Sequence, residues 1–194
     1  MKTSVKIILG LVSVLLVACV AGVVLIYRQT SKTQEQFAPL LESCRGNTVS
    51  QAAAYTDTPG NHPAMGVMKS KLGLRIYTYI VPDEVLAASV AEAQLVLCAT
   101  EAEEVLIERC PYATKNEKGA EATNVVERYY YQQEVKLVEA KTGRTIASET
   151  LRGKDPRECL KQETFLKGQE TVKVKGQEIS SRDLQEWIRP YVIK

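Results

Sequence analysis

The longest run of hydrophobic positions covers residues 7–27 and contains no charged side chain. At about 1.5 Å per residue, a helix of this length spans roughly 30 Å, the thickness of the hydrocarbon core of a bilayer. Lipid offers no partners to open backbone groups, so only a helix suits such a segment. We therefore predict one transmembrane helix at residues 7–27, with the lipid bilayer as its partner, behind a short N-terminal tail at residues 1–6.

A second interpretation of this run comes from the motif LVAC, which ends at Cys19 and matches the lipobox of bacterial lipoproteins. Mature lipoproteins turn polar directly after the lipidated cysteine, whereas residues 20–26 stay apolar. The uncleaved anchor is therefore favoured, and lipidation at Cys19 is the alternative. Either form tethers the protein to a membrane.

The chain turns polar after the apolar run. Residues 29–36 contain no apolar side chain and show no helical period, which indicates a polar stalk at residues 28–36. Hydrophobic residues return at Phe37, and the remaining length suits one domain. We expect a single extracytoplasmic globular domain over residues 37–194.

Alternating and continuous apolar positions predict several strands in this domain. The predicted strands are residues 72–80, 94–98, 104–112, 125–139, 144–151 and 169–175. The turn AKTG at residues 140–143 joins two of them in a hairpin. In the strand at residues 125–139, alternation places Tyr129 and Tyr131 on the buried face and Arg128 and Tyr130 on the wet face.

Two short helices complete the prediction. One covers residues 82–93 and opens with proline and two acidic residues, which suit a helix N-terminus. Ser180 or Ser181 can cap a C-terminal helix that ends at Pro190 and packs on the sheet through Trp187. The fold class is therefore α+β, mainly β: an antiparallel meander with a short middle helix and a C-terminal helix, preceded by one transmembrane helix.

Four cysteines follow the apolar run, and none belongs to a CxxC pair. Cys44, Cys98, Cys110 and Cys159 therefore suggest two structural disulfides, which persist in an oxidising compartment. This places the N-terminus in the cytoplasm and the domain outside it. The alternative is four buried free thiols in a cytoplasmic domain.

The pairing of these cysteines depends on the strands that carry them. If residues 94–98 and 104–112 form a tight hairpin, Cys98 and Cys110 lie roughly 17 Å apart at strand rise, too far for a disulfide. The turn after Leu151 should come near the loop of that hairpin. We therefore expect Cys98–Cys159 and Cys44–Cys110.

The charge of the domain is balanced. Of the 25 Lys and Arg residues, only Lys2 and Lys6 precede the apolar run, which leaves 23 after it. All 23 Asp and Glu residues also follow the run. Proteins that bind nucleic acid normally carry a basic excess. Nucleic acid is therefore not an expected partner.

Candidate chemistry is sparse. The only histidine is His62, which we interpret as a loop residue that packs or bonds to backbone. Acidic residues cluster at Glu101, Glu103, Glu104 and Glu108, where a solvated charge run is the default. Paired carboxylates there would make an enzyme that acts on cell-wall or sugar substrates the alternative. Phosphate-binding, nucleophile-elbow and zinc-protease motifs are absent from the sequence, so we expect no enzyme, cofactor or metal.

Several segments resemble those of one group of proteins. They are LVLC and CPY around Cys98 and Cys110, then VEAKTGRTIAS, PREC and LQEWIRPYV. Over Cys44 to Val192, the chain resembles an uncharacterised bacterial family of secreted or membrane-anchored cysteine-containing domains. That family has no established activity, so the resemblance assigns no functional residue. The AKTG hairpin also resembles one found in bacterial envelope lipoproteins.

These features favour one class of function. An anchor, a stalk, four cysteines and no catalytic motif indicate a membrane-tethered extracytoplasmic domain that is not an enzyme. We expect it to bind an envelope protein or another cell-surface partner.

Overall fold

The computed structural model describes residues 28–115 and 121–194, which build one seven-stranded sheet. The strands are β1 (Ala64–Ser70), β2 (Gly73–Ile76), β3 (Leu95–Thr100), β4 (Glu103–Lys115), β5 (Glu121–Glu139), β6 (Thr145–Arg152) and β7 (Thr171–Lys175). The 3₁₀ turns are η1 (Ala38–Leu41), η2 (Ser43–Arg45), η3 (Thr78–Ile80) and η4 (Asp83–Val85). Residues 28–37 are α-helical, and helix α2 (Ser181–Val192) lies near the C-terminus.

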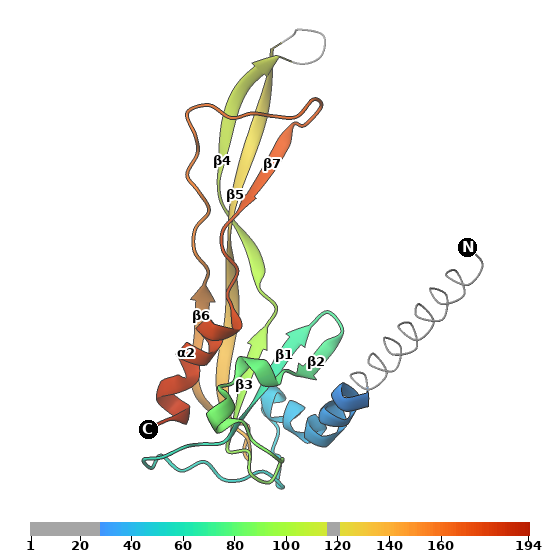
Figure 1. The fold of residues 1–194 in the computed structure, drawn as a ribbon, viewed down its shortest axis with the longest axis vertical. Helices are drawn as coiled ribbons and strands as arrows, with labels where there is room; N and C mark the ends of the chain where they lie inside the picture. The colour runs from blue at the N-terminus through green and yellow to red at the C-terminus, as the bar shows by residue number, and fades with distance from the viewer. Residues whose placement is uncertain (1–27, 116–120) are drawn as a thin grey trace, which may run out of the picture.

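Strand β5 is the centre of the sheet, and its 19 residues serve two sets of neighbours. Its C-terminal part pairs with β3 on one side and β6 on the other. Its N-terminal part pairs with β4 and β7. The first part belongs to a wide base, which also contains β1, β2 and α2. The second belongs to a narrow arm that projects from the base (Figure 1).

The sheet is mixed, so the expected antiparallel meander is wrong. β1 pairs with β3 in parallel, and β7 pairs with β5 in parallel. Strands β3 and β4 were expected to form a hairpin, but they follow one another along β5 instead. At their junction, Thr100 Oγ1 accepts from the Glu134 N–H (3.1 Å), and Gln133 Nε2 donates to the Thr100 carbonyl (2.5 Å). These side-chain contacts bridge the break in the ladder.

The strand expected at residues 72–80 is shortened to β2 and is followed by η3. β1 and β2 pair antiparallel, and Gly73 adopts φ 102° in the turn between them. Ser70 Oγ accepts from the Leu72 N–H at 3.1 Å and supports this turn. A positive φ suits glycine, so the chain reverses directly before β2. The preceding strand β1 was not among the predicted strands.

The helix expected at residues 82–93 is reduced to η4 and irregular chain. The Ala87 N–H donates to the Ala64 carbonyl at 2.9 Å, and Leu86 forms a parallel bridge with Ala64. The segment thus bonds to the sheet through β1. The backbone groups that make these bonds are not available for the hydrogen bonds of an α-helix.

The predicted C-terminal helix is present as α2. Ser180 forms a capping box: its Oγ accepts from the Asp183 N–H (3.3 Å), and the Asp183 carboxylate accepts from the Ser180 N–H (2.7 Å). Trp187 joins the helix to β6, because its Nε1 donates to Glu149 Oε2 at 2.6 Å. The expectation that Pro190 ends the helix is wrong, since α2 continues past it.

The expected stalk at residues 28–36 is helical and touches the base. The Gln34 side chain accepts from the Ile76 N–H (2.9 Å) and donates to the Ile76 carbonyl (2.7 Å). Its amide therefore occupies the outer edge of β2, as a neighbouring strand would. Gln36 Nε2 donates to the Ala88 carbonyl at 3.0 Å. Gln34 and Gln36 therefore hold this helix against the domain.

Within residues 28–115 and 121–194, no helix combines the length and apolar character needed to cross a membrane. The fold class with a preceding transmembrane helix is therefore not supported. The expected tail at residues 1–6, the expected anchor at residues 7–27 and Cys19 lie outside the described residues.

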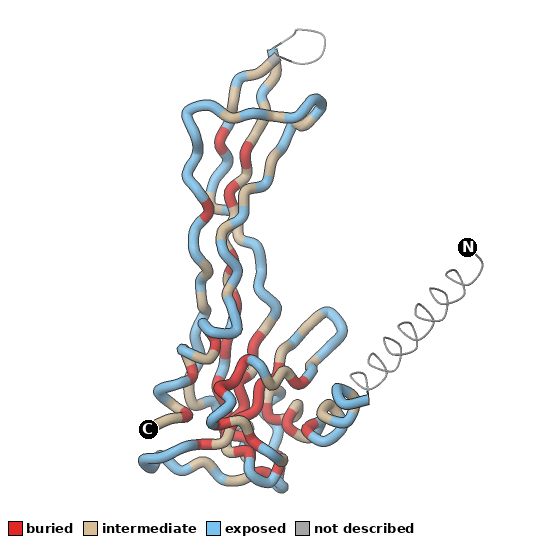
Figure 2. The backbone as a smooth tube through the Cα atoms, viewed as in Figure 1, coloured by how far each residue is buried: buried red, intermediate tan, exposed pale blue. Residues whose placement is uncertain are grey.

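The base buries both faces of its sheet, whereas the arm is thinner and more exposed (Figure 2). Helix α2, η3 and η4 pack on one face, and η1 with residues 49–52 packs on the other. Buried residues against α2 include Leu95, Leu97, Val135, Leu137, Leu184 and Ile188. Those on the opposite face include Leu40, Met65, Val67, Val96 and Val138.

Strand β5 changes its buried face along its length. In the base, Val135 and Leu137 are buried, as the alternation predicts. In the arm, Val126 and Arg128 are buried instead, on positions of the opposite parity. Because successive side chains point to opposite faces, different segments must cover the two parts of the strand.

Glu139 ends β5 and is nearly buried, with 8% of its side chain exposed. It accepts from Thr142 Oγ1 (2.7 Å), the Tyr55 N–H (3.3 Å) and Arg144 Nε (3.4 Å). Burial alone would raise the pKa of Glu139. The hydrogen bonds from Thr142, Tyr55 and Arg144 outweigh it and hold that pKa below its ordinary value.

Because the pKa of Glu139 is lowered, we expect the stability of the fold to depend on pH. A lowered pKa in the folded state stabilises the protein above the unfolded pKa and ceases to do so as pH falls through the folded pKa. We expect the free energy of unfolding of the native chain to fall relative to that of Glu139→Gln below about pH 5. Urea titrations over a pH series measure it. The control is Glu134→Gln, at an exposed position of the same strand. If the free energy of unfolding changed with pH in the same way for the native chain and for Glu139→Gln, the lowered pKa of Glu139 would be contradicted.

Candidate binding surface on the arm

The four cysteines form two disulfides, as expected, but both expected pairs are wrong. Cys44 joins Cys98 with 5.7 Å between Cα atoms, and Cys110 joins Cys159 with 6.1 Å. The expected pairs, Cys98–Cys159 and Cys44–Cys110, assumed a hairpin of β3 and β4. Because these strands are successive, Cys98 lies in the base and Cys110 in the arm. Each therefore bonds to the segment that covers its own part of the sheet.

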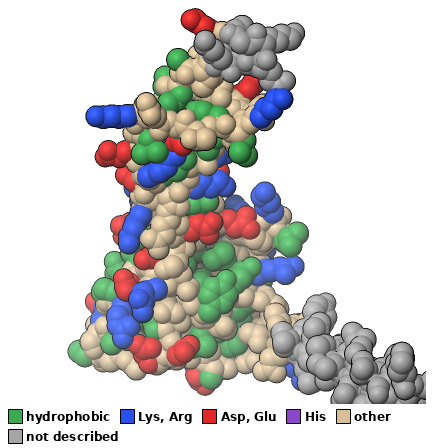
Figure 3. All heavy atoms as spheres, turned by 45° about the horizontal axis from the view of Figure 1, so that its top comes forward, with side chains coloured by type: hydrophobic (Ala, Val, Ile, Leu, Met, Phe, Trp, Pro, Cys, Tyr) green, Lys and Arg blue, Asp and Glu red, His purple; other side chains and the backbone are tan. Residues whose placement is uncertain are grey.

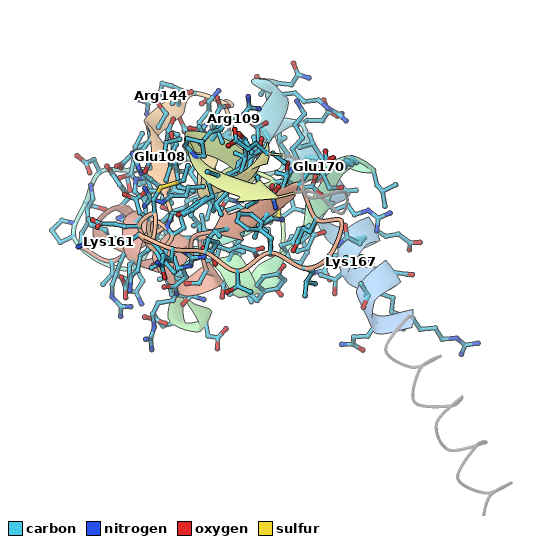
Figure 4. All side chains as sticks on the ribbon, turned by 90° about the horizontal axis from the view of Figure 1, so that it is seen from above. Glu108, Arg109, Arg144, Lys161, Lys167 and Glu170 are labelled. Atoms are coloured by element: carbon cyan, nitrogen blue, oxygen red, sulfur yellow. A yellow bond between two sulfur atoms is a disulfide. The ribbon has the colours of Figure 1, made fainter. Side chains whose placement is uncertain are left out.

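Residues 153–170, here called the strap, cover one face of the arm. The strap leaves β6, crosses the arm and returns at β7. Viewed along the arm, it runs from Lys161 on one side to Lys167 on the other (Figure 4). Cys159 bonds it to β4, so the sheet and its cover are covalently joined.

The start of the strap and the residue directly after β7 lie close to one another beside β5. The N–H groups of Gly153 and Gly176 both donate to β5 carbonyls at 2.8 Å. A Cβ atom at Gly153 would lie 2.2 Å from the Gln177 carbonyl oxygen, and one at Gly176 would lie 1.9 Å from the Lys154 carbonyl oxygen. Glycine is required at both positions because backbone approaches backbone.

Arg128 holds the strap from within the sheet. Its Nε donates to the Arg157 carbonyl (2.7 Å) and one terminal nitrogen to the Pro156 carbonyl (3.0 Å), while the other forms an ion pair with Glu108. Alternation placed Arg128 on a wet face, which is wrong because the strap buries that face. A guanidinium carries five donors in a fixed fork, so one side chain can satisfy two carbonyls and a carboxylate.

Hydrophobic side chains of the strap remain exposed near the end of the arm. Tyr112 of β4 packs against Phe165 with ring centroids 5.7 Å apart, and its hydroxyl donates to the Leu160 carbonyl at 2.8 Å. Leu160 and Leu166 are 49% and 74% exposed. We call Tyr112, Leu160, Phe165 and Leu166 the arm patch. In Figure 3, hydrophobic side chains reach the surface near this end of the arm, between isolated charged groups.

A turn fixes the most exposed member of the arm patch. The Gln169 N–H donates to the Leu166 carbonyl (2.9 Å), and Gln169 Oε1 accepts from the Leu166 N–H (3.2 Å). Gly168 adopts φ 77° within this turn. Asn124 Nδ2 donates to the Gln169 carbonyl at 3.0 Å and ties the turn to β5. Leu166 is therefore presented by a closed, hydrogen-bonded loop.

The turn borders a surface cavity of about 690 Å³. Its wall combines strap residues 163–170 with Thr114, Ala122 and Asn124 of the arm strands. Thr114 Oγ1 is within 3.2 Å of Asn124 Oδ1, so these polar groups bond to one another. Phe165 and Leu166 supply the apolar part of the cavity wall.

The opposite face of the arm is polar and internally paired. Arg109 and Glu127 form an ion pair at 3.1 Å, and the Tyr129 hydroxyl donates to Glu127 Oε2 at 2.7 Å. Lys173 lies over the Tyr129 ring, 5.0 Å from its centroid. The hydrogen bond from Tyr129, together with the nearby Arg109 charge, lowers the pKa of Glu127, and the same bond raises the pKa of Tyr129. These groups are partnered within the sheet.

The acidic cluster predicted from the sequence does not converge on a site. Glu104 forms an ion pair with Lys175, and Glu108 forms one with Arg128. Glu101 and Glu103 are exposed. None of the four lines the arm cavity or a second groove of about 420 Å³ beside the Cys44–Cys98 disulfide.

His62 and the disulfides offer no obvious metal site within the described ranges. His62 is buried, with Nδ1 2.9 Å from Gln94 Oε1 and Nε2 2.9 Å from the Thr58 carbonyl oxygen. The one close group of potential ligands in the described chain is Glu108 with Cys110 and Cys159. Those cysteines bond to each other and Glu108 to Arg128, so these atoms already have partners.

Comparisons with known protein families, with curated proteins and with solved structures gave no match. The resemblance noted in the sequence therefore stays a prediction.

Loss of the Arg128 side chain should release the strap. Arg128→Met leaves the Pro156 and Arg157 carbonyls and Glu108 without their donor, and we expect a loss of about 2–4 kcal/mol in the free energy of unfolding. Trypsin should then cut after Lys161 and Lys167 faster than in the native chain. Urea titration and peptide mass spectrometry measure the two effects.

The matched control is Arg109→Met on the open face of the arm, where 66% of the arginine side chain is exposed. An exposed ion pair contributes about 0–1 kcal/mol, so this variant should remain close to the native chain in both measurements. Equal effects of the two variants would show that Arg128 does not hold the strap.

Proposed function

We propose that this protein is a non-enzymatic binding protein of the cell envelope, in which the base supports the arm and the arm patch contacts a protein partner. The observation that carries the proposal is the exposure of Leu160 and Leu166 on a covalently fixed strap. Large apolar side chains that a fixed segment keeps in water favour an interaction site, because their exposure is costly.

Rigidity supports a binding role for the arm patch. The Cys110–Cys159 bond and the Arg128 contacts hold the strap before any partner arrives. A loop that is already ordered loses less conformational entropy on binding, which leaves more of the contact energy for affinity. Tyr112 and Phe165 add aromatic area, which interfaces favour.

The chemistry of the arm patch favours a protein over other partners. It combines two leucines and two aromatic rings with a cavity that can take a side chain. Nucleic acid would require a basic excess, and the domain has a balanced charge. The carboxylates at residues 101–108 are exposed or held in ion pairs, so no observation favours the enzyme alternative.

Location outside the cytoplasm is part of the proposal and is supported by the two disulfides. Such bonds persist in oxidising compartments and are rare in the cytosol. Tethering through residues 7–27, or through a lipid on Cys19, stays a prediction from the sequence.

Photo-crosslinking tests the partner. A photoreactive residue in place of Leu166 should yield a discrete crosslinked protein in intact cells. The same residue in place of Leu72, which is also highly exposed but lies on the base, should not yield that product. Leu160→Ser should weaken the product at position 166. The same band from both positions, or no product at position 166, would contradict the proposal.

Thiol labelling tests the compartment separately. With a membrane-impermeant maleimide on intact cells, Cys44, Cys98, Cys110 and Cys159 should label only after reduction. Disulfide-bonded thiols do not react, and external cysteines are reached without lysis. Labelling that requires broken membranes and no reductant would place the domain in the cytoplasm and contradict the proposed location.

A further inference from the structure

The β1–β2 hairpin carries a surface that the arm patch does not explain. Between Ala64 and Pro82 the chain contains three cations, Lys69, Lys71 and Arg75, and no Asp or Glu. All three are exposed. The ion pairs formed within the described chain involve none of them. In a domain of balanced overall charge, this hairpin carries three exposed cations and no acidic residue of its own.

Exposed hydrophobic side chains accompany these charges. Leu72, at the tip of the hairpin, is 79% exposed, and Tyr79 is 56% exposed. Tyr79 lies beside Tyr77, with ring centroids 5.5 Å apart. Leucine, tyrosine and lysine together suit the boundary between water and lipid, where aromatic and apolar groups enter and cations contact headgroups.

The helix that starts at Arg28 docks on this hairpin. The described helix begins at Arg28, directly after residues 7–27, and Gln34 docks on Ile76 of the hairpin. From residue 28 to residue 34 a helix rises only about 9 Å. Figure 1 shows residues 28–37 and the hairpin on the same side of the base. Arg28 therefore lies only about two helical turns from the side chain that docks on the hairpin.

We propose that the β1–β2 hairpin rests on an anionic lipid surface, with Lys69, Lys71 and Arg75 at the headgroups and Leu72 entering between them. Long-range attraction by negatively charged lipid acts within a Debye length of the surface, which the short helix permits. The contact is independent of the partner at the arm patch. This contact would also fix the orientation of the base on the lipid surface. The hairpin would touch the headgroups, and Gln34 already holds the preceding helix against the hairpin.

Acetylation of lysines tests the proposal on the full chain. The protein is mixed with vesicles of phosphatidylcholine alone, or of equal parts phosphatidylcholine and phosphatidylglycerol, and treated with acetic anhydride. Mass spectrometry then compares Lys69 and Lys71 with Lys173 on the arm. We expect Lys69 and Lys71 to react several-fold less on the anionic vesicles, and Lys173 to be unchanged. High salt should remove the difference, because it screens the attraction.

Two variants of matched exposure separate this contact from the arm. Leu72→Asn should restore much of the reactivity at Lys69 and Lys71, whereas Leu166→Asn should not. Equal reactivity of Lys69 and Lys71 on both kinds of vesicle, equal protection of Lys173, or absence of the protein from the vesicle fraction would overturn the proposal. A failed crosslink at position 166 would leave this result unaffected.

Discussion

The architecture depends on the shared strand β5, whose two parts are covered by different segments of the chain. A strand that continues from a wide base into a narrow arm cannot be covered by one layer of helices. In the base, α2 covers Val135 and Leu137. In the arm, the strap covers Val126 and Arg128. The arginine, the second disulfide and the glycine crossing at Gly153 and Gly176 all follow from the need to cover the arm from the other side.

Local patterns predicted much of the β5–β6 hairpin and of α2. The alternation over residues 125–139, the AKTG turn and the Ser180 cap each depend on near neighbours in the sequence, so the sequence alone could predict them. Cysteine number and spacing predicted two disulfides for the same reason. The arm patch carried no such signal, because Leu160 and Leu166 lie in a segment without periodicity.

Long-range pairing could not be predicted from these patterns. Alternation predicts that β4 is a strand but does not say whether it pairs with β3 or continues beyond it along β5. The parallel pairing of β7 depends on a strap that returns across the arm. The error at Arg128 has the same origin, since a residue on a polar face becomes buried once a distant segment covers it. The wrong disulfide pairing followed from the wrong strand pairing.

One continuous strand between base and arm has a mechanical consequence. A pull on the arm along β5 is carried into the base by the covalent backbone, while β3 and β6 grip the same strand from both sides. The hydrogen bonds from β3 and β6 to β5 lie across the direction of the pull, so they would all have to break at the same time. In a pair of strands pulled apart from one end, the bonds break one after another. Tension applied to the arm would therefore reach the base without first peeling the arm away from it.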